Sequence, residues 1–428
     1  MKILLVNYRF FISGGPEKYM FNIKKVLEEN GHEVIPFSIH SYKNVETDYS
    51  KYFVEPIGGR EAVYFKDIKK TPKTVWQLLT RSIYSFEVKR AIKKVIKETA
   101  PDVVYIIHFV NKLSPSVISG AKQLGVPVVL RLSDYFLLCP RFDFVYNNKV
   151  CEDCLTQGYL TCIKRGCVQN SKFASIVRVF SMKVHKWLRI YDDVDAFITP
   201  SEFLREKIVS NGFSDCKSFC VPTFTVSKSR VIEDNVGSYG LYFGRLVPEK
   251  GVETLIKAYE KLPNKKLKIV GDNSTIEGQR LKKYVENNRI NNIEFLGFKH
   301  GDALEKIICD ARFTVIPSIW YDNLPNTALE SFRYYKPIIA SNLGSLPEIV
   351  VNGTNGYLFE AGNVSDLVNK IKLFDNDNEV KRMGMNGYLY LNDKFSLDKH
   401  YGKLMEIFTE VCGTNTYSNR FKGTDNRC

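Results

Sequence analysis

Two basic residues stand in a short turn between an expected strand and an expected helix. The turn reads Gly-Arg-Leu-Val-Pro-Glu-Lys-Gly over residues 244–251, with Arg245 directly after the apolar run Tyr239–Phe243 and Lys250 just before an amphipathic stretch. In open α/β sheets, ligands bind beyond the carboxyl ends of the strands. Two fixed cations beside a helix N-terminus suit a diphosphate. The alternative is a surface turn with two unrelated basic residues.

A second candidate element follows another expected strand and carries two acidic residues. Residues 317–330 read Pro-Ser-Ile-Trp-Tyr-Asp-Asn-Leu-Pro-Asn-Thr-Ala-Leu-Glu, so that seven residues separate Asp322 from Glu330. A carboxylate that accepts hydrogen bonds from two neighbouring hydroxyls could hold a ribose or hexose ring. Backbone N–H groups near Asn326 and Thr327 lie at a helix start and could bind phosphate. Taken alone, the two acids could equally be ordinary charges at a helix start.

Together with two later segments, these elements resemble family 4 of the glycosyltransferases. The segments are Ala-Ser-Asn-Leu-Gly-Ser-Leu-Pro-Glu over 340–348 and Gly-Tyr-Leu-Phe over 356–359, and the resemblance is continuous over roughly 240–373. The N-terminal half agrees more loosely, through Gly-Gly-x-Glu over 14–17 and Asp-Val-Val over 102–104. The resemblance implies the α/β GT-B fold, in which two Rossmann-like domains face each other across a cleft. It also implies sugar transfer from a nucleotide donor with retention at the anomeric carbon and without a catalytic metal.

The resemblance also implies roles for individual residues. Arg245 and Lys250 would bind the donor diphosphate, and Glu330 would bind the ribose hydroxyls. Asp322 would face the transferred sugar; the family usually has Glu at this position, so the shorter side chain of this chain alters the reach. Gly15 would let the N-terminal loop approach the same region, because glycine has no Cβ in the way.

On the acceptor side, His108 follows an expected strand and resembles the active-site histidine of the family. The alternative for His108 is a histidine of the core. The family often has another histidine just before the position of Asp134, where this chain has Ser133, so one imidazole is missing. The expected catalytic residues are therefore His108, Arg245, Lys250 and Asp322, and the expected donor-binding residues are Gly15, Arg245, Lys250, Asp322, Asn326, Thr327 and Glu330.

A cysteine cluster forms a separate candidate site. The chain has ten cysteines, and its first apolar run is too short for the core of a secretion signal, which favours reduced thiols or a metal site over disulfides. Four thiolates in two close pairs could form a structural zinc site that pins a loop over about 139–167. Unliganded thiols are the alternative. The four expected ligands are Cys151, Cys154, Cys162 and Cys167.

The formal net charge of +14 predicts an anionic partner, which could be nucleic acid, a membrane surface or a phosphorylated substrate. No nucleic-acid-binding motif is present, so we expect no nucleic acid partner. Basic and aromatic residues alternate between Arg60 and Lys97, a pattern that suits peripheral contact with an anionic membrane. The alternative is a solvated face of an amphipathic helix. The basic residues inside this stretch are Lys66, Lys69, Lys70, Lys73, Arg81, Lys89, Arg90, Lys93 and Lys94.

The elements that must position these residues are short Val- and Ile-rich strands that alternate with amphipathic helices. This pattern occurs twice and is typical of parallel sheets covered on both faces. We therefore expect a Rossmann-like acceptor-side domain over 1–225, a Rossmann-like nucleotide-sugar-binding domain over 226–412 and a disordered tail over 413–428. The expected strands are Lys2–Asn7, Glu33–Ser38, Val103–Phe109, Val126–Leu132, Ala196–Thr199, Tyr239–Phe243, Leu267–Gly271, Ile293–Phe295, Phe313–Ile316 and Pro337–Ala340.

These observations predict a cytoplasmic glycosyltransferase of surface polysaccharide biosynthesis, associated with the inner face of the membrane. Its donor would be a UDP- or GDP-sugar, and its acceptor a saccharide or a lipid-linked saccharide. One alternative is a sugar-nucleotide epimerase of the same fold, which would need an acid–base constellation that the motifs do not supply. The other is a non-catalytic protein that binds polyanions, with strong salt dependence and no need for Glu330.

Overall fold

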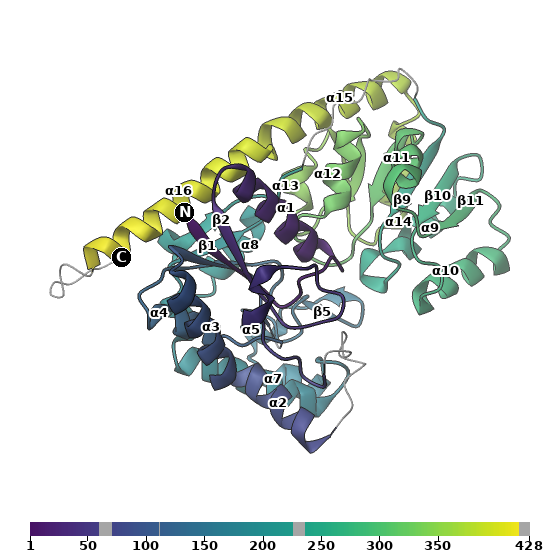
Figure 1. Ribbon diagram of the computed structural model, residues 1–428. Helices are drawn as coiled ribbons and strands as arrows, with labels where there is room; N and C mark the ends of the chain where they lie inside the picture. Colours follow the sequence, from purple (N-terminus) through teal and green to yellow (C-terminus); the bar gives the residue numbers. More distant parts are fainter. Residues whose placement is uncertain (60–70, 111, 226–235, 419–428) are drawn as a thin grey trace.

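The computed structural model describes residues 1–59, 71–110, 112–225 and 236–418, with side chains up to residue 413. Two six-stranded sheets organise the chain, and every neighbouring strand pair in both sheets is parallel (Figure 1). The first sheet has the order β2-β1-β3-β4-β7-β8, and the second has the order β11-β10-β9-β12-β13-β14. The two α/β domains expected from the sequence are therefore present.

The strands of the first sheet are β1 (Lys2–Asn7), β2 (Glu33–Phe37), β3 (Val103–His108), β4 (Val128–Arg131), β7 (Ala196–Thr199) and β8 (Ser218–Cys220). The strands of the second sheet are β9 (Tyr239–Phe243), β10 (Lys266–Val270), β11 (Ile293–Gly297), β12 (Phe313–Ile316), β13 (Ile338–Ser341) and β14 (Gly356–Phe359). A short antiparallel pair, β5 (Val145–Tyr146) and β6 (Lys149–Val150), lies in the cysteine-containing loop.

Helices connect the strands in both halves. Before the second sheet they are α1 (Gly15–Glu29), α2 (Pro72–Ile83), α3 (Phe86–Thr99), α4 (Ser116–Lys122), α5 (Asp153–Thr156), α6 (Leu160–Arg165), α7 (Lys172–Trp187) and α8 (Glu202–Val209). From β9 onward they are α9 (Val252–Glu260), α10 (Ile276–Asn287), α11 (Gly301–Cys309), α12 (Asn326–Arg333), α13 (Leu346–Ile349), α14 (Val364–Leu373), α15 (Asp377–Lys394) and α16 (Leu397–Ser418).

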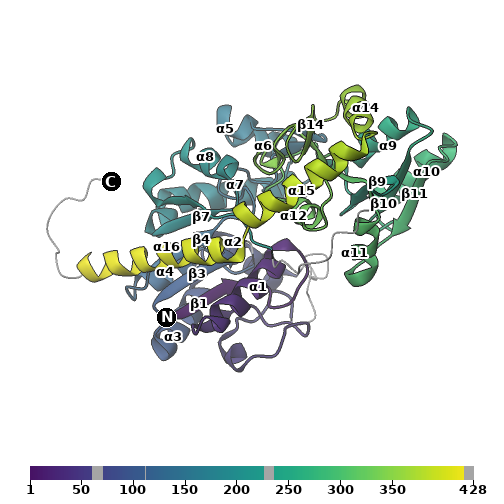
Figure 2. The same cartoon turned by 90° about the horizontal axis from the view of Figure 1, so that it is seen from above.

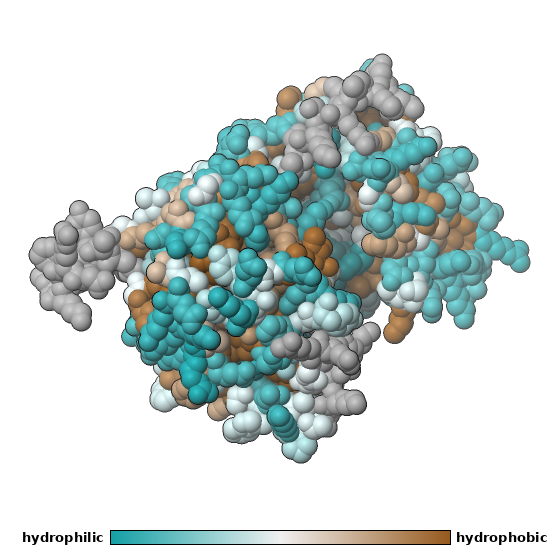
Figure 3. Space-filling model, viewed as in Figure 1, coloured by the Kyte–Doolittle hydropathy of each residue, from teal (hydrophilic) through white to brown (hydrophobic). Residues whose placement is uncertain are grey.

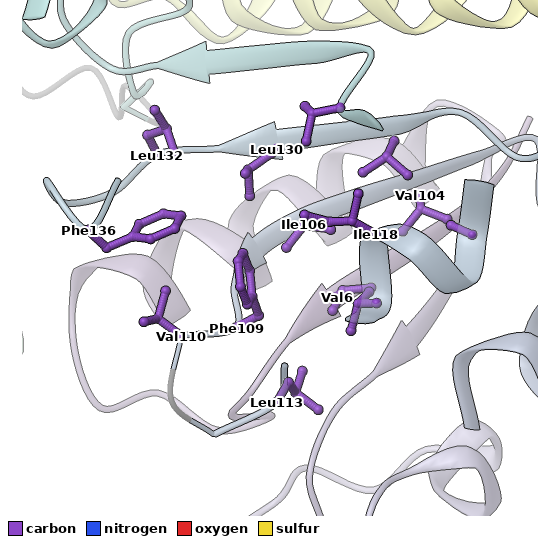
Figure 4. Packing of buried hydrophobic residues seen from close by; sticks show 14 of the residues in the cluster. Val6, Val104, Ile106, Phe109, Val110, Leu113, Ile118, Leu130, Leu132 and Phe136 are labelled. Atoms are coloured by element: carbon purple, nitrogen blue, oxygen red, sulfur yellow. The ribbon is translucent and has the colours of Figure 1, made fainter. Parts of the chain in front are cut away.

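The first sheet is buried on both faces, as the continuous apolar runs of its strands require. Successive residues of β1 point to opposite faces, so Leu4 and Val6 join one core cluster whereas Ile3 and Leu5 join another. Figure 4 shows part of the first cluster, in which the rings of Phe109 and Phe136 meet edge to face with centroids 5.5 Å apart. The core thus extends to the loops that follow β3 and β4, where the acceptor side is expected.

The last helix departs from the expected division of the chain. After α15, which packs on α12 in the second domain, α16 continues in nearly the same direction and runs along the first domain (Figures 1 and 2). Its residues Leu404, Ile407, Phe408 and Val411 are buried in the same cluster as Ile3 and Leu5 of β1. The part of the chain from Leu397 onward therefore packs with the N-terminal domain, because its apolar stripe covers one face of the first sheet.

The expected disordered tail also needs correction. Residues 413–418 form the end of α16, and residues 419–428 lie outside the described residues. Within the described part of the chain, no helix has the length and apolar character that a membrane-spanning segment needs. Of the expected basic stretch, residues 60–70 are also outside the described residues.

Candidate active site

A glycine locks the basic turn after β9 against the loop after β12. Gly251 has a φ of +65°, and a Cβ built there would lie only 2.0 Å from the carbonyl oxygen of Pro317. No other residue type fits such a close approach of two backbones. The backbone N–H of Ile319 donates to the carbonyl of Glu249 at 3.0 Å and adds a second link. Since β9 and β12 are neighbours in the sheet, the two candidate motifs meet at one sheet edge.

This contact brings Lys250 and Asp322 together. The Lys250 Nζ lies 2.5 Å from Asp322 Oδ1, and the Asp322 side chain is only 5% exposed. The Ser318 hydroxyl donates to the other carboxylate oxygen, so both oxygens of Asp322 have partners. Lys250 Nζ also lies 5.4 Å from the centre of the Trp320 ring. The result is a cation and an anion with fixed positions at the carboxyl end of the second sheet.

Arg245 lies on the same turn but in a different environment. Its side chain is exposed, and it makes no ion pair with any residue that the structure describes. Its backbone is fixed, because the Tyr242 hydroxyl donates to the Arg245 carbonyl at 2.7 Å. The backbone of Arg245 is thus fixed, while its exposed guanidinium can bind an anion.

The remaining donor-site candidates lie where α12 of the second domain meets α1 of the first. Lys18 Nζ on α1 lies 3.0 Å from Glu330 Oε1 on α12, so this acid bridges the two domains. A Cβ built on Gly15 would lie 3.6 Å from the Asn326 amide nitrogen. This is an ordinary van der Waals distance, so the N-terminal loop touches the first turn of α12 at this point. Thr327 follows Asn326 in the first turn of α12.

His108 ends β3 in the first domain and faces Asp134. Its Nε2 lies 3.6 Å from Asp134 Oδ2, and its ring meets that of Tyr8 edge to face at 5.0 Å. The Nδ1 atom is buried without a hydrogen-bond partner among the described residues. Burial raises the pKa of the Asp134 carboxyl, and the nearby His108 partly opposes that rise. His108 and Asp134 thus form a polar pair inside an otherwise apolar strand end.

The His108–Asp134 pair is linked to the donor side through two neighbouring residues. The Tyr135 hydroxyl donates to the backbone carbonyl of Tyr321 at 3.3 Å. In the sequence, Tyr135 directly follows Asp134, and Tyr321 directly precedes Asp322. The structure therefore brings the His108–Asp134 pair of one domain and Asp322, the expected sugar-facing acid of the other, to adjoining loops.

Two family models match successive parts of the chain, and together they show the family to which it belongs. The model described as Glycosyltransferase Family 4 matches residues 13–225, and the model described as Glycosyl transferases group 1 matches residues 233–390. The chain belongs to glycosyltransferase family 4. All of the candidate residues from Gly15 to Glu330 lie within the two matches.

Relatives of this family 4 chain include an uncharacterised glycosyltransferase of Methanocaldococcus jannaschii, which is 30% identical over 51% of this chain and 60% of its own length. The sulfoquinovosyl transferase of Arabidopsis thaliana is 25% identical over 87% of this chain and 66% of its own length. The chain covers 60%, 30% and 44% of three archaeal relatives, which is less than two thirds of each.

Solved structures confirm the GT-B fold of this family 4 chain. Sucrose-phosphate synthase from Thermosynechococcus elongatus superposes with a TM-score of 0.70 at 16% identity, over 96% of this chain and 99% of the other. The HepE protein of Anabaena in complex with UDP gives a TM-score of 0.62 at 16% identity, over 96% and 100% of the chains.

The structure gives no support to the expected zinc site. The structure describes all four cysteines, and no three His, Cys, Asp or Glu side chains among the described residues are arranged to hold a metal ion. Instead, Cys151 accepts a hydrogen bond from Arg165 at 3.4 Å, and Arg165 also pairs with Asp153 at 2.6 Å. The thiols of Cys154 and Cys167 each contact the thiol of Cys162. Ion pairs and buried thiols therefore hold this loop.

Several contacts of the site were not foreseen from the sequence. Lys18 follows Gly15 by one helical turn, a spacing that places both on one face of α1 and could have indicated it. Ser318, which orients Asp322, gives no signal beyond its position after β12. Glu348 lies in the matching 340–348 segment without an assigned role, and its carboxylate accepts the N–H groups of Glu202 and Phe203 at 2.8 and 2.6 Å. It thus caps the first turn of α8 from the other domain.

Proposed function

We propose that this chain transfers a sugar from a UDP- or GDP-sugar to a hydroxyl of a saccharide or lipid-linked saccharide, with retention at the anomeric carbon. The observation that carries the proposal is the fixed Lys250–Asp322 pair, on the same turn as an exposed Arg245 and at the carboxyl end of the second sheet. That position suits a diphosphate and the sugar attached to it.

On the donor side, the cations bind the diphosphate, and the acids bind sugar hydroxyls. Arg245 and Lys250 neutralise the charge that develops on the departing nucleotide diphosphate, which is the main electrostatic demand of the reaction. Asp322 holds hydroxyls of the transferred sugar, and Ser318 keeps its carboxylate in position. Glu330 binds the ribose hydroxyls, while Lys18 places that carboxylate from the opposite domain. With two cations on the leaving group, the transfer proceeds without a catalytic metal.

For the acceptor, the first domain offers an aromatic and basic hollow beside His108. The hollow lies beyond the ends of β1 and β2, and its lining includes Tyr8, Arg9, Phe11, His40, Ser41 and Lys112. Tyr8 belongs to this hollow and also contacts the His108 ring. Aromatic faces pack on sugar rings, and the polar groups bind their hydroxyls. An acceptor saccharide that laid one edge on this hollow would lie next to the His108–Asp134 pair.

The family relatives support a role in polysaccharide biosynthesis. A capsular polysaccharide biosynthesis glycosyltransferase of Staphylococcus aureus is 26% identical over 36% of this chain and 41% of its own length. HepE is a structural neighbour solved with UDP. We infer from these two that a surface polysaccharide is the product and a uridine nucleotide the first donor to test.

The test is the variant Arg245→Ala, compared with Lys283→Ala on an exposed part of α10. Because Arg245 is exposed and unpaired among the described residues, its loss leaves the fold intact. We expect turnover with the preferred sugar nucleotide to fall roughly 100-fold, by analogy with the loss of one oxyanion donor. The control should keep wild-type turnover. Equal rates in both variants would remove the diphosphate assignment.

The product distinguishes this proposal from its two alternatives. Transfer requires an acceptor and releases the nucleoside diphosphate, which a coupled assay measures. An epimerase would change the free sugar nucleotide without any acceptor. A polyanion-binding protein would turn over no sugar nucleotide and would bind many polyanions with strong salt dependence. Either of these results contradicts the transferase assignment.

A further inference from the structure

Helix α7 exposes an apolar stripe that no other part of the described chain covers. Phe173, Ile176, Phe180 and Trp187 are 64%, 47%, 56% and 80% exposed. Their spacing of three, four and seven residues places them along one face of the helix. The opposite face is buried and carries residues such as Met182. A helix with one face packed and one apolar face in water needs a partner for that second face.

Two helices that adjoin α7 also expose large apolar side chains. Both α2 and α6 pack against α7, and they expose Trp76 (68%) and Leu160 (64%). The Ser181 hydroxyl of α7 donates to the Ser82 carbonyl of α2 at 2.5 Å, which fixes the two helices to each other. We call the outer side of α2, α6 and α7 the α7 surface. The face of the molecule shown in Figure 3 is largely hydrophilic.

The charge of the α7 surface has one sign. The segments Pro72–Ile83, Leu160–Arg165 and Lys172–Trp187 contain no Asp or Glu. These segments carry exposed lysines instead, and on α7 the helical spacing puts them along one edge of the apolar stripe. The exposed lysines are Lys73, Lys164, Lys172, Lys183 and Lys186. Tryptophan and phenylalanine beside lysines suit the boundary between lipid headgroups and acyl chains. The lysines match anionic headgroups, to which each contributes attraction near the surface.

We propose that the α7 surface docks on an anionic lipid bilayer. Its lysines meet the phosphate headgroups while Phe173, Phe180 and Trp187 enter the acyl boundary. The surface differs from the stretch that the sequence indicated, because most of its apolar residues come from α7. Arg81 of that stretch does not take part, since it is 2% exposed and donates to the carbonyls of Lys112 and Glu55.

The inner face of α7 connects this docking surface to the acceptor side. Arg178 Nη2 donates to the Phe136 carbonyl at 2.7 Å, and its guanidinium lies 4.8 Å from the centre of the Phe142 ring. Phe136 belongs to the loop that carries Asp134. A bilayer in contact with α7 would therefore be separated from this loop by only the thickness of one helix. At that distance, the saccharide of a lipid-linked acceptor could reach the loop while its lipid stays in the bilayer. Only this last link rests on the proposed function, because docking itself needs no catalysis.

Vesicle sedimentation of the full-length protein tests the proposal. We expect wild-type protein to bind phosphatidylcholine vesicles that contain phosphatidylglycerol, and to bind pure phosphatidylcholine at least about tenfold more weakly. The double variant Phe180→Ser/Trp187→Ser should bind the anionic vesicles roughly tenfold or more weakly than wild type, because two interfacial anchors are lost. The matched control is Ile276→Ser/Phe298→Ser, which removes side chains 90% and 70% exposed on the second domain. It should bind as wild type does.

Two results would overturn the docking proposal. One is equal vesicle binding by the α7 double variant and by the control. The other is a wild-type dimer in light scattering that the α7 variant dissociates, without vesicle binding by either protein, since the surface would then pair two copies. Calorimetric titration with UDP should give the same affinity in both double variants. A loss of UDP binding in all proteins would count against the proposed function and leave the docking result standing.

Discussion

At the scale of single residues, the contact between Lys250 and Asp322 defines the candidate site. The two are 72 positions apart in the sequence, yet their charged atoms lie 2.5 Å apart. Their positions after two strands could be predicted, because ligands bind at the carboxyl ends of parallel strands. Their direct contact could not, since it depends on Gly251 and on strand order. The pairs of Glu330 with Lys18 and of His108 with Asp134 likewise join segments that only the fold brings together.

The bridging role of Glu330 leads to a prediction about nucleotide binding. The variant Glu330→Gln keeps the shape of the side chain but loses the charge that strengthens hydrogen bonds to ribose. We expect the affinity for UDP or GDP to fall roughly tenfold, equivalent to one charge-assisted hydrogen bond. Isothermal titration measures this change. In Lys18→Met, which removes the partner at 3.0 Å and keeps the acid, the loss should be smaller. A larger loss in Lys18→Met would assign the nucleotide contact to Lys18.

At the scale of elements, strands were predicted well where the apolar run is long and bounded. Tyr239–Phe243 and Phe313–Ile316 have the expected bounds, whereas β8 was missed because Ser-Phe-Cys has little hydrophobic signal. The 356–359 segment was matched to the family without being predicted as β14. The polar composition of residues 413–428 predicts a disordered tail, whereas residues 413–418 lie in α16. The burial of α16 depends on its packing against a distant sheet. Tertiary contacts of this kind leave no local pattern.

The turn glycines offer a test of how tightly the two motifs are fixed. Gly251 and Gly353 both have positive φ, +65° and +79°, but only Gly251 faces a backbone atom within contact distance. Gly353→Ala should lose about 1–2 kcal/mol of unfolding free energy from left-handed strain alone. Gly251→Ala should lose at least about 1–3 kcal/mol more, because its Cβ overlaps the Pro317 carbonyl. Urea denaturation measures both. Equal losses would contradict the close approach seen at Gly251.

At the scale of the whole molecule, the return of α16 ties the end of the chain to the first domain. His400 is central to this tie and is 4% exposed. Its Nδ1 lies 2.7 Å from the Pro222 carbonyl oxygen, and its Nε2 lies 3.0 Å from the Tyr19 hydroxyl. Burial lowers the pKa of His400 to about 3, and the charge of Arg131 adds to this effect. The imidazole is therefore neutral in the folded protein at ordinary pH.

The low pKa of His400 predicts acid sensitivity. In the unfolded chain the group takes up a proton below pH ~6.5, whereas the folded protein does so only near pH 3. Its contribution to stability is thus complete above the unfolded pKa and is lost as pH falls from there toward 3. Over this range the unfolding free energy falls by up to about 1.4 kcal/mol per pH unit, the value for one proton taken up on unfolding.

Urea denaturation of wild type and His400→Gln over this pH range checks the prediction. Burial also lowers the pKa of His185, to about 4, so the wild-type profile contains both histidines. The variant should keep the His185 contribution and lose that of His400, which gives a shallower fall. Parallel profiles, each referred to its own value at neutral pH, would mean that His400 does not titrate between the folded and unfolded states.

The chain passes between its two domains twice, once before β9 and once between α15 and α16, and the two passages touch. The backbone N–H of Thr225 donates to the carbonyl of Phe395 at 3.2 Å. Because the two connections lie side by side, we expect the domains to rotate relative to each other about a single axis through these connections and to resist rotation about other axes. A protease that cut either passage would leave the halves joined by the other, so nicked protein would stay in one piece until denatured.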